Sequence, residues 1–171
     1  MTPFEIADAL RACLDGEFTG DTGAPNEVCH RPGDIVPLNF GTVQDECCTG
    51  LGWVRVVSVD PVIDAGATEQ ANYSPCNVFE SRITLELGVA RCNPSGTREA
   101  GPTCDQWTAL ALRMDLDRAA MKRAVCCFQE ASGESVVRTV GGTWLPMDSS
   151  GGCAGGTMTV TVYTDCDECG S

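Results

Sequence analysis

Histidine is almost absent from this sequence, and its scarcity limits the chemistry that the chain can perform. The 171 residues include a single histidine, His30, in a Cys-His-Arg-Pro-Gly stretch. Most acid-base and nucleophilic devices in enzymes depend on an imidazole. We therefore interpret His30 as a loop side chain with a local hydrogen bond and expect it to have no catalytic role.

Basic residues and long apolar runs are also scarce. Eleven Lys and Arg stand against 24 Asp and Glu, which gives a net charge of -13. Such a charge opposes binding to phosphate backbones and anionic lipid surfaces. No apolar run approaches the roughly 20 residues that span a bilayer, because Arg55, Glu86 and Asp115 interrupt the longest ones. We expect neither tight nucleic-acid binding nor a membrane partner.

The first residues, Met1-Thr2-Pro3-Phe4-Glu5, lack the basic and apolar regions of a secretory signal, which predicts synthesis in a cytoplasm. Twelve cysteines, in contrast, approach the density of a disulfide scaffold. We expect the chain to fold with its thiols reduced, and any disulfides to form afterwards. Cysteines in exposed connections are expected to pair before those on the long helix described below: Cys47, Cys48, Cys76 and Cys153. Of the adjacent pairs Cys47-Cys48 and Cys126-Cys127, each member is expected to reach a different, distant cysteine if it pairs.

Three short motifs invite a catalytic or metal-binding interpretation, and each departs from its pattern. Asp148-Ser149-Ser150-Gly151-Gly152 is similar to the serine loop of trypsin-like proteases but carries an extra serine. Pro75-Cys76 lacks the second cysteine of a zinc-deaminase signature, since position 79 is Phe. Cys166 and Cys169 have metal-ligand spacing without a second pair to complete four ligands. We predict no catalytic, cofactor-binding or metal site, no cofactor and no enzyme activity.

The sequence contains two capping-box motifs, each of which predicts the start of a helix. Thr2-Pro3-Phe4-Glu5 and Thr103-Cys104-Asp105-Gln106 each place a threonine three residues before a Glu or Gln. The first predicts a helix from Pro3 to about Asp15, ended by Gly16. The second predicts a long helix from Thr103 to Phe128. Its apolar face is unusually wide, which fits either burial in its own core or packing on a neighbouring subunit. The apolar residues form two stripes: Trp107, Leu110, Met114, Met121 and Val125 in one, and Leu112, Leu116 and Ala119 in the other.

The remaining segments predict strands and loops. Residues 20–50 indicate loop with one edge strand near Ile35-Val36-Pro37-Leu38, and Leu51–Val59 reads as a strand covered on both faces and ended by Asp60-Pro61. The stretch Val78–Arg91 alternates, with Ile83, Leu85, Leu87 and Val89 on one side. Val136–Val140, a Gly141-Gly142 connection and Thr157–Tyr163 predict a closing hairpin.

The order helix, strand, strand, helix, strand, strand predicts a single α+β domain over residues 1–171. Its mixed or antiparallel sheet is expected to be flanked by the N-terminal helix and the long helix, with an acidic cysteine-containing tail at 164–171.

This order of elements and several short sequence segments resemble the tail terminator proteins of long-tailed bacteriophages, in a cysteine-rich version from phages of actinobacteria. The segments are Asp45-Glu46-Cys47-Cys48-Thr49-Gly50, Gly88-Val89-Ala90-Arg91-Cys92, and Trp144-Leu145-Pro146 leading into Gly151-Gly152-Cys153-Ala154-Gly155-Gly156. The loop before Cys47 and the tail at 164–171 depart from the family pattern.

The resemblance implies a structural protein of the virion neck that carries no catalytic residues. It implies a homohexameric ring that caps the completed tail tube, ends its growth and offers a joining surface to the head completion or stopper protein. Genome DNA would pass through such an acidic ring without tight binding. The alternatives are another head-tail connector component, such as a head completion or stopper protein, and a secreted cysteine-stapled binding module.

Overall fold

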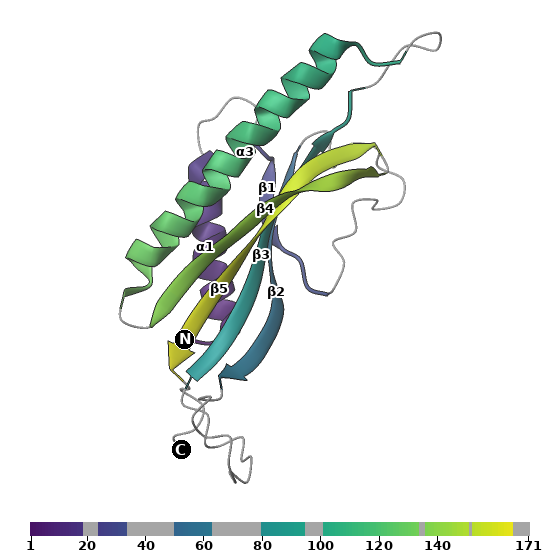
Figure 1. Cartoon of the computed structure of the whole chain (residues 1–171). Helices are drawn as coiled ribbons and strands as arrows, with labels where there is room; N and C mark the ends of the chain where they lie inside the picture. The colour runs from purple at the N-terminus through teal and green to yellow at the C-terminus, as the bar shows by residue number, and fades with distance from the viewer. Residues whose placement is uncertain are drawn as a thin grey trace.

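The computed structural model describes residues 1–18, 24–33, 50–62, 80–94, 101–133, 136–150 and 152–165. Within these ranges the chain forms two helices and five strands, with one main core and a smaller buried cluster of Leu51, Trp53, Ala90 and Cys153 (Figure 1). The elements are α1 (Pro3–Phe18), β1 (Glu27–His30), β2 (Leu51–Val62), β3 (Glu80–Cys92), α3 (Cys104–Ala131), β4 (Arg138–Ser150) and β5 (Cys153–Asp165).

The strands form one mixed sheet in the order β1-β2-β3-β5-β4. β1 runs parallel to β2, and every other neighbouring pair is antiparallel. The predicted α+β class is therefore confirmed. The element order differs by one addition, because the short edge strand β1 lies at Glu27–His30 within the segment predicted as loop. The predicted edge strand at Ile35–Leu38 falls outside the described residues.

Both helices pack on the same face of the sheet and enclose the main core (Figure 1). The predicted alternation of β3 is confirmed, since Ile83, Leu85, Leu87 and Val89 are all buried against the helices. Fully burying side chains of this size contributes about 1.5–3 kcal/mol each. From the helices, the core receives Ile6, Leu10, Leu14, Met121, Ala124 and Phe128.

Both predicted capping boxes are present. The Glu5 amide donates to Thr2 Oγ1 at 3.2 Å, and the Thr2 amide donates to Glu5 Oε2 at 2.7 Å. Thr103 and Gln106 make the same two bonds at the start of α3. The predicted end of α1 at Gly16 is wrong, because the helix continues to Phe18, whose ring is buried in the core. Burial of that ring outweighs the weak helix preference of glycine.

β2 also differs from its predicted description. Its first four residues are buried on both faces, but from Arg55 onward its side chains reach solvent on one or both faces. Asp60-Pro61 does not end the strand, which runs to Val62 in register with Glu80. Asp60 is held there by Ser58 and Arg82, which donate to its Oδ2 at 2.9 and 3.2 Å.

The closing hairpin is confirmed, but its turn lies elsewhere. Gly141-Gly142, predicted as the connection, lies inside β4 at a register shift. The chain turns instead between Ser150 and Cys153, where Gly152 has a φ of 85°. A Cβ at Gly142 would meet Thr159 Oγ1 at 2.2 Å, so close approach to β5 and not a turn requires glycine here. β5 extends to Asp165, which places the first two residues of the predicted tail in the sheet.

A disulfide between Cys13 and Cys127 ties α1 to α3 with a Cα separation of 5.9 Å. Cysteines of the long helix were expected to pair less readily than those of exposed connections, yet Cys127 of that helix is bonded. Its neighbour Cys126 is an exposed free thiol, so the two members of this adjacent pair do behave differently. Cys153, expected to pair, takes part in a disulfide, as does Cys92. Cys47, Cys48 and Cys76 lie outside the described residues.

Candidate interaction surface

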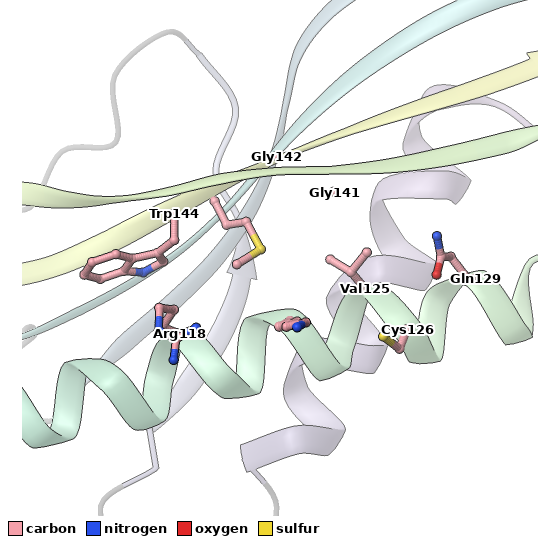
Figure 2. A pocket seen from close by; sticks show the side chains of 9 residues that line it. Arg118, Val125, Cys126, Gln129, Gly141, Gly142 and Trp144 are labelled. Atoms are coloured by element: carbon pink, nitrogen blue, oxygen red, sulfur yellow. The ribbon is translucent and has the colours of Figure 1, made fainter.

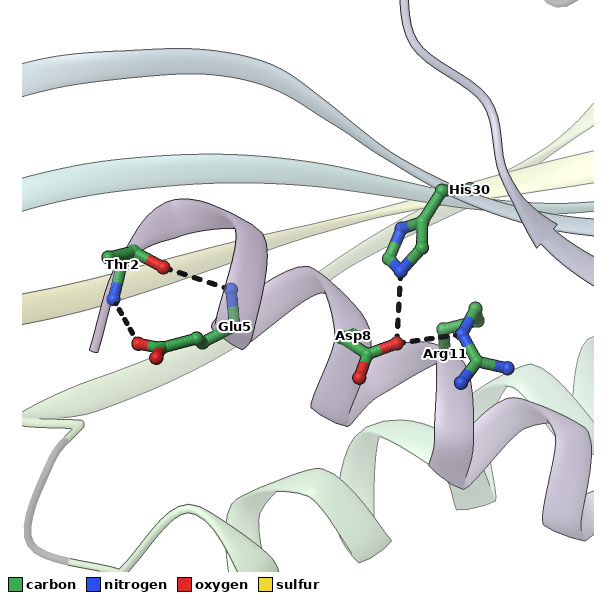
Figure 3. Close-up of polar contacts among 5 residues, drawn as sticks. All are labelled: Thr2, Glu5, Asp8, Arg11 and His30. Atoms are coloured by element: carbon green, nitrogen blue, oxygen red, sulfur yellow. Dashed lines mark hydrogen bonds and ion pairs between the residues drawn. The ribbon is translucent and has the colours of Figure 1, made fainter.

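The residues that suggested catalysis are not brought together. His30 lies on β1 and Ser149 and Ser150 lie at the end of β4, and these strands form opposite edges of the sheet. His30 Nε2 is 3.1 Å from Asp8 Oδ1 (Figure 3). The ring centroid of His30 lies 5.0 Å from that of Phe4. Hydrogen bonds with His30 and Arg11 hold the pKa of the Asp8 carboxyl below its usual value. The prediction of a loop side chain with a local hydrogen bond is therefore wrong, because His30 lies in strand β1 and its partner Asp8 lies on α1, 22 residues earlier in the chain.

The described thiols show no arrangement for metal binding. Within the described ranges no cluster of three His, Cys, Asp or Glu side chains could hold a metal ion. Burial, together with the Glu27 carboxylate, raises the pKa of the Cys29 thiol, which disfavours its reactive thiolate. Cys76, Cys166 and Cys169 lie outside the described residues. No described helix combines the length and apolarity that a membrane crossing needs.

The long helix α3 changes character at Asp117. From that residue onward, one face is buried against α1 and the sheet, through residues such as Met121 and Phe128. Before it, residues 104–116 extend past the end of α1 (Figure 1) and contain no fully buried residue. We call residues 104–116 the projecting half of α3. It contains the first part of both predicted apolar stripes.

The large apolar side chains of the projecting half are largely in solvent. Trp107 is 44% exposed, Leu112 65% and Leu116 57%. At about 100° per residue, Leu112 and Leu116 lie on the side of α3 away from the core-facing residues. Trp107 instead continues the line of the buried Val125. The projecting half is therefore apolar on two sides without a covering element among the described residues.

A buried ion pair marks the boundary between the two halves. Arg91 on β3 donates two hydrogen bonds to the Asp117 carboxylate, at 2.8 and 2.5 Å. Asp117 is 3% exposed and Arg91 8%. Arg113 approaches the same carboxylate at 3.5 Å. Sequence reasoning missed this pair, because Asp117 lies between Asp115 and Arg118 in a charged stretch and the sequence does not show that it alone is buried.

A groove separates α3 from β4, with a volume of about 420 Å³. Arg118, Lys122 and Gln129 border it from the helix, and Gly141, Gly142 and Trp144 from the strand (Figure 2). A second cavity of about 470 Å³ lies at the start of α1, lined by Phe4, His30, Val54 and others. The sequence predicted neither, because both depend on side chains from distant segments.

No protein-family model matches this sequence, and no curated protein matches it either.

Proposed function

We propose that this chain is a structural protein of a bacteriophage neck, which caps the completed tail tube as a ring, ends tube growth and presents the surface that joins the head. Its partners are the other copies of itself in a homohexameric ring, the tail tube protein, and the head completion or stopper protein. Its location is the tail or neck of the virion, after synthesis in the host cytoplasm. The sequence resemblance supplies this role.

The observation that carries the assembly part of the proposal is the exposed apolar projecting half of α3. Large apolar side chains such as Trp107, Leu112 and Leu116 are rarely left in solvent together on a helix unless another protein covers them. A neighbouring copy that covers this half would complete its burial. In a closed ring, each copy would give this half to one neighbour and receive that of another.

The sheet and the charge are compatible with the same role. β1 and β4 are the sheet edges, to which a neighbouring copy could add contacts. The net charge of -13 would let DNA pass through a ring without binding tightly. We further propose that the chain has no hydrolase, transferase or redox turnover, so His30→Ala and Ser150→Ala should abolish no activity.

The test measures native mass and tube growth with the full chain. The wild-type protein should form a multi-subunit particle and stop polymerisation of the cognate tail tube protein. Leu112→Gln with Leu116→Gln should give a folded monomer that no longer stops it, because the apolar cover for the neighbour is lost. Val57→Gln with Val59→Gln, at two exposed apolar residues (47% and 50%) of the interior strand β2, is the matched control and should leave both properties intact.

Two outcomes would contradict the proposal. A wild-type chain that stays monomeric at high concentration would remove the ring. A particle that forms but leaves tube polymerisation unaffected would favour another head-tail connector component instead.

A second candidate function is a secreted, cysteine-stapled binding module. The Cys13–Cys127 disulfide and the bonded Cys92 and Cys153 favour it, since such modules depend on their bridges. Collapse of the reduced protein to a disordered chain would support this candidate, whereas a cooperative melt under reductant would support the neck protein.

A further inference from the structure

The groove between α3 and β4 lies where β4 has two consecutive glycines, Gly141 and Gly142, at its register shift. Gly141 pairs with the core residue Val160 and so lies on the side of β4 that faces α3, whereas a Cβ at Gly142 would meet Thr159 of β5. A Cβ at Gly141 would meet no atom within 4 Å, so the groove is empty at this point. Its volume of about 420 Å³ lies in the range of ligand-binding clefts.

One wall of the groove presents a hydrogen-bond donor without an acceptor. The Trp144 ring lies above Arg118 on the side of β4 that faces α3 (Figure 2). Its indole Nε1 is buried and has no hydrogen-bond partner among the described residues. Buried donors are nearly always paired, so this one is suited to an acceptor brought by a ligand. Val125 and Met158 add apolar surface beside it.

The helical wall presents positive charge in a chain that is otherwise acidic. Lys122 is the single lysine of the sequence, and within the described part of the chain it has no ion-pair or hydrogen-bond partner. Arg118, one turn earlier, has the exposed Asp115 as its one ion-pair partner among the described residues, at 2.8 Å. An exposed pair of this kind is weak, so Arg118 can also turn to a second carboxylate. The groove therefore favours an anionic ligand.

The length of the groove indicates what carries the anion. It extends along α3 from Arg118 to Gln129, where Gln129 Nε2 donates to the Thr139 carbonyl at 3.3 Å and bridges helix and strand. Eleven steps of helix span about 16 Å. An extended peptide covers that length with about five residues, whereas a free ion would fill only a fraction of it. β4 is also a sheet edge, beside which an extended chain can lie.

From these features we propose that the groove binds an extended acidic segment of a partner protein. An Asp or Glu carboxylate of the segment contacts Lys122 and Arg118 and accepts the Trp144 indole hydrogen. An apolar side chain of the segment packs on Val125 and Met158. This site is separate from the projecting half of α3 and does not depend on ring assembly.

The probe is a capped hexapeptide that alternates glutamate and leucine, titrated into the full chain. Calorimetry gives the affinity, and the indole N–H signals in a proton-nitrogen spectrum give the location. The Trp144 signal should move, while those of Trp53, already bonded to Glu86 at 3.1 Å, and of Trp107 should stay. The same peptide with glutamine in place of glutamate should bind at least tenfold more weakly, because the charged acceptor is lost.

Three variants and one control separate a binding role from a structural one. Lys122→Ala should weaken peptide binding about five- to tenfold, while its neighbour Arg123→Ala, which removes equal charge from a residue paired with Glu17, should not. Trp144→Phe should weaken binding in a protein that stays folded, because it removes the unpaired donor. Gly141→Val should fill the groove and abolish binding in a folded protein.

Several results would overturn the proposal. The first is a Trp144 signal that does not move at millimolar peptide, and the second is equal peptide binding by Lys122→Ala and the wild type. The third is a Trp144 shift that inorganic phosphate produces and the peptide does not. The last would make the groove a site for a free anion.

Discussion

The two halves of α3 have similar apolar content but different surroundings. Residues 117–131 face α1 and the sheet, and the Cys13–Cys127 disulfide fixes them there. The projecting half continues the helix through 104–116 with Trp107, Leu112 and Leu116 in solvent. The difference shows that apolar content alone does not decide burial, because one part of this helix packs in the core and the other leaves its large apolar side chains in solvent.

The largest expected effect comes from shortening one apolar side chain in each half of α3 and comparing the losses of stability. Phe128→Ala removes a fully buried ring and should lower the free energy of unfolding by about 3–5 kcal/mol. Leu112→Ala removes a side chain that is 65% exposed and should change it by less than about 0.5 kcal/mol in the monomer. Urea denaturation of both variants at low protein concentration gives the comparison. Equal losses would show that the projecting half is also packed in the isolated chain.

A second prediction concerns the covalent tie of the buried half. The double variant Cys13→Ala with Cys127→Ala should lower the free energy of unfolding by about 2–4 kcal/mol, because the bond closes a long loop in the unfolded chain. The fold should persist, since Leu10, Leu14 and Met121 remain buried around the site. Circular dichroism and thermal melts measure both effects. A disordered double variant would mean that the core alone cannot hold α1 on α3.

Local signals in the sequence predicted the parts of the fold that depend on neighbours in the chain. The capping residues Thr2 and Thr103 and the alternation of Ile83 to Val89 were confirmed, because each depends on spacing within a few residues. The class of the fold followed from their order.

The features that were missed depend on contacts between distant segments. Gly141-Gly142 has the composition of a turn, but glycine is required at position 142 because Thr159 of β5 approaches it closely. Cys127 pairs with a cysteine 114 residues away, and Arg91 with an aspartate 26 residues away. The wide apolar face of α3 was recognised, but only the structure shows which half remains exposed. The groove at Trp144 had no signal in the sequence.

A third prediction uses the two helix caps to compare a packed helix start with a projecting one. Thr2→Ala should lower the free energy of unfolding by about 1 kcal/mol, since α1 is part of the core from Ile6 onward. Thr103→Ala removes the equivalent bond, from the Gln106 amide to Thr103 Oγ1, at the start of a half helix with no fully buried residue. It should mainly increase hydrogen exchange of the amides in 104–116, with a smaller change in global stability. Equal shifts in melting temperature would place the projecting half in the cooperative core.

The smallest expected effect lies at the start of α1, away from α3, and depends on pH. Hydrogen bonds from His30 and Arg11 lower the folded-state pKa of Asp8, so the folded chain binds a proton there less readily than the unfolded chain. The resulting stabilisation is present above the unfolded pKa near 3.8 and is lost as the pH falls through the folded value. Asp8→Asn should therefore lower the melting temperature slightly at pH 7 and not at pH 3. Glu130→Gln removes an equal charge at an exposed position of α3 and should leave this pH dependence unchanged. The same small loss at pH 3 as at pH 7 would show that Asp8 contributes through packing and not through its charge.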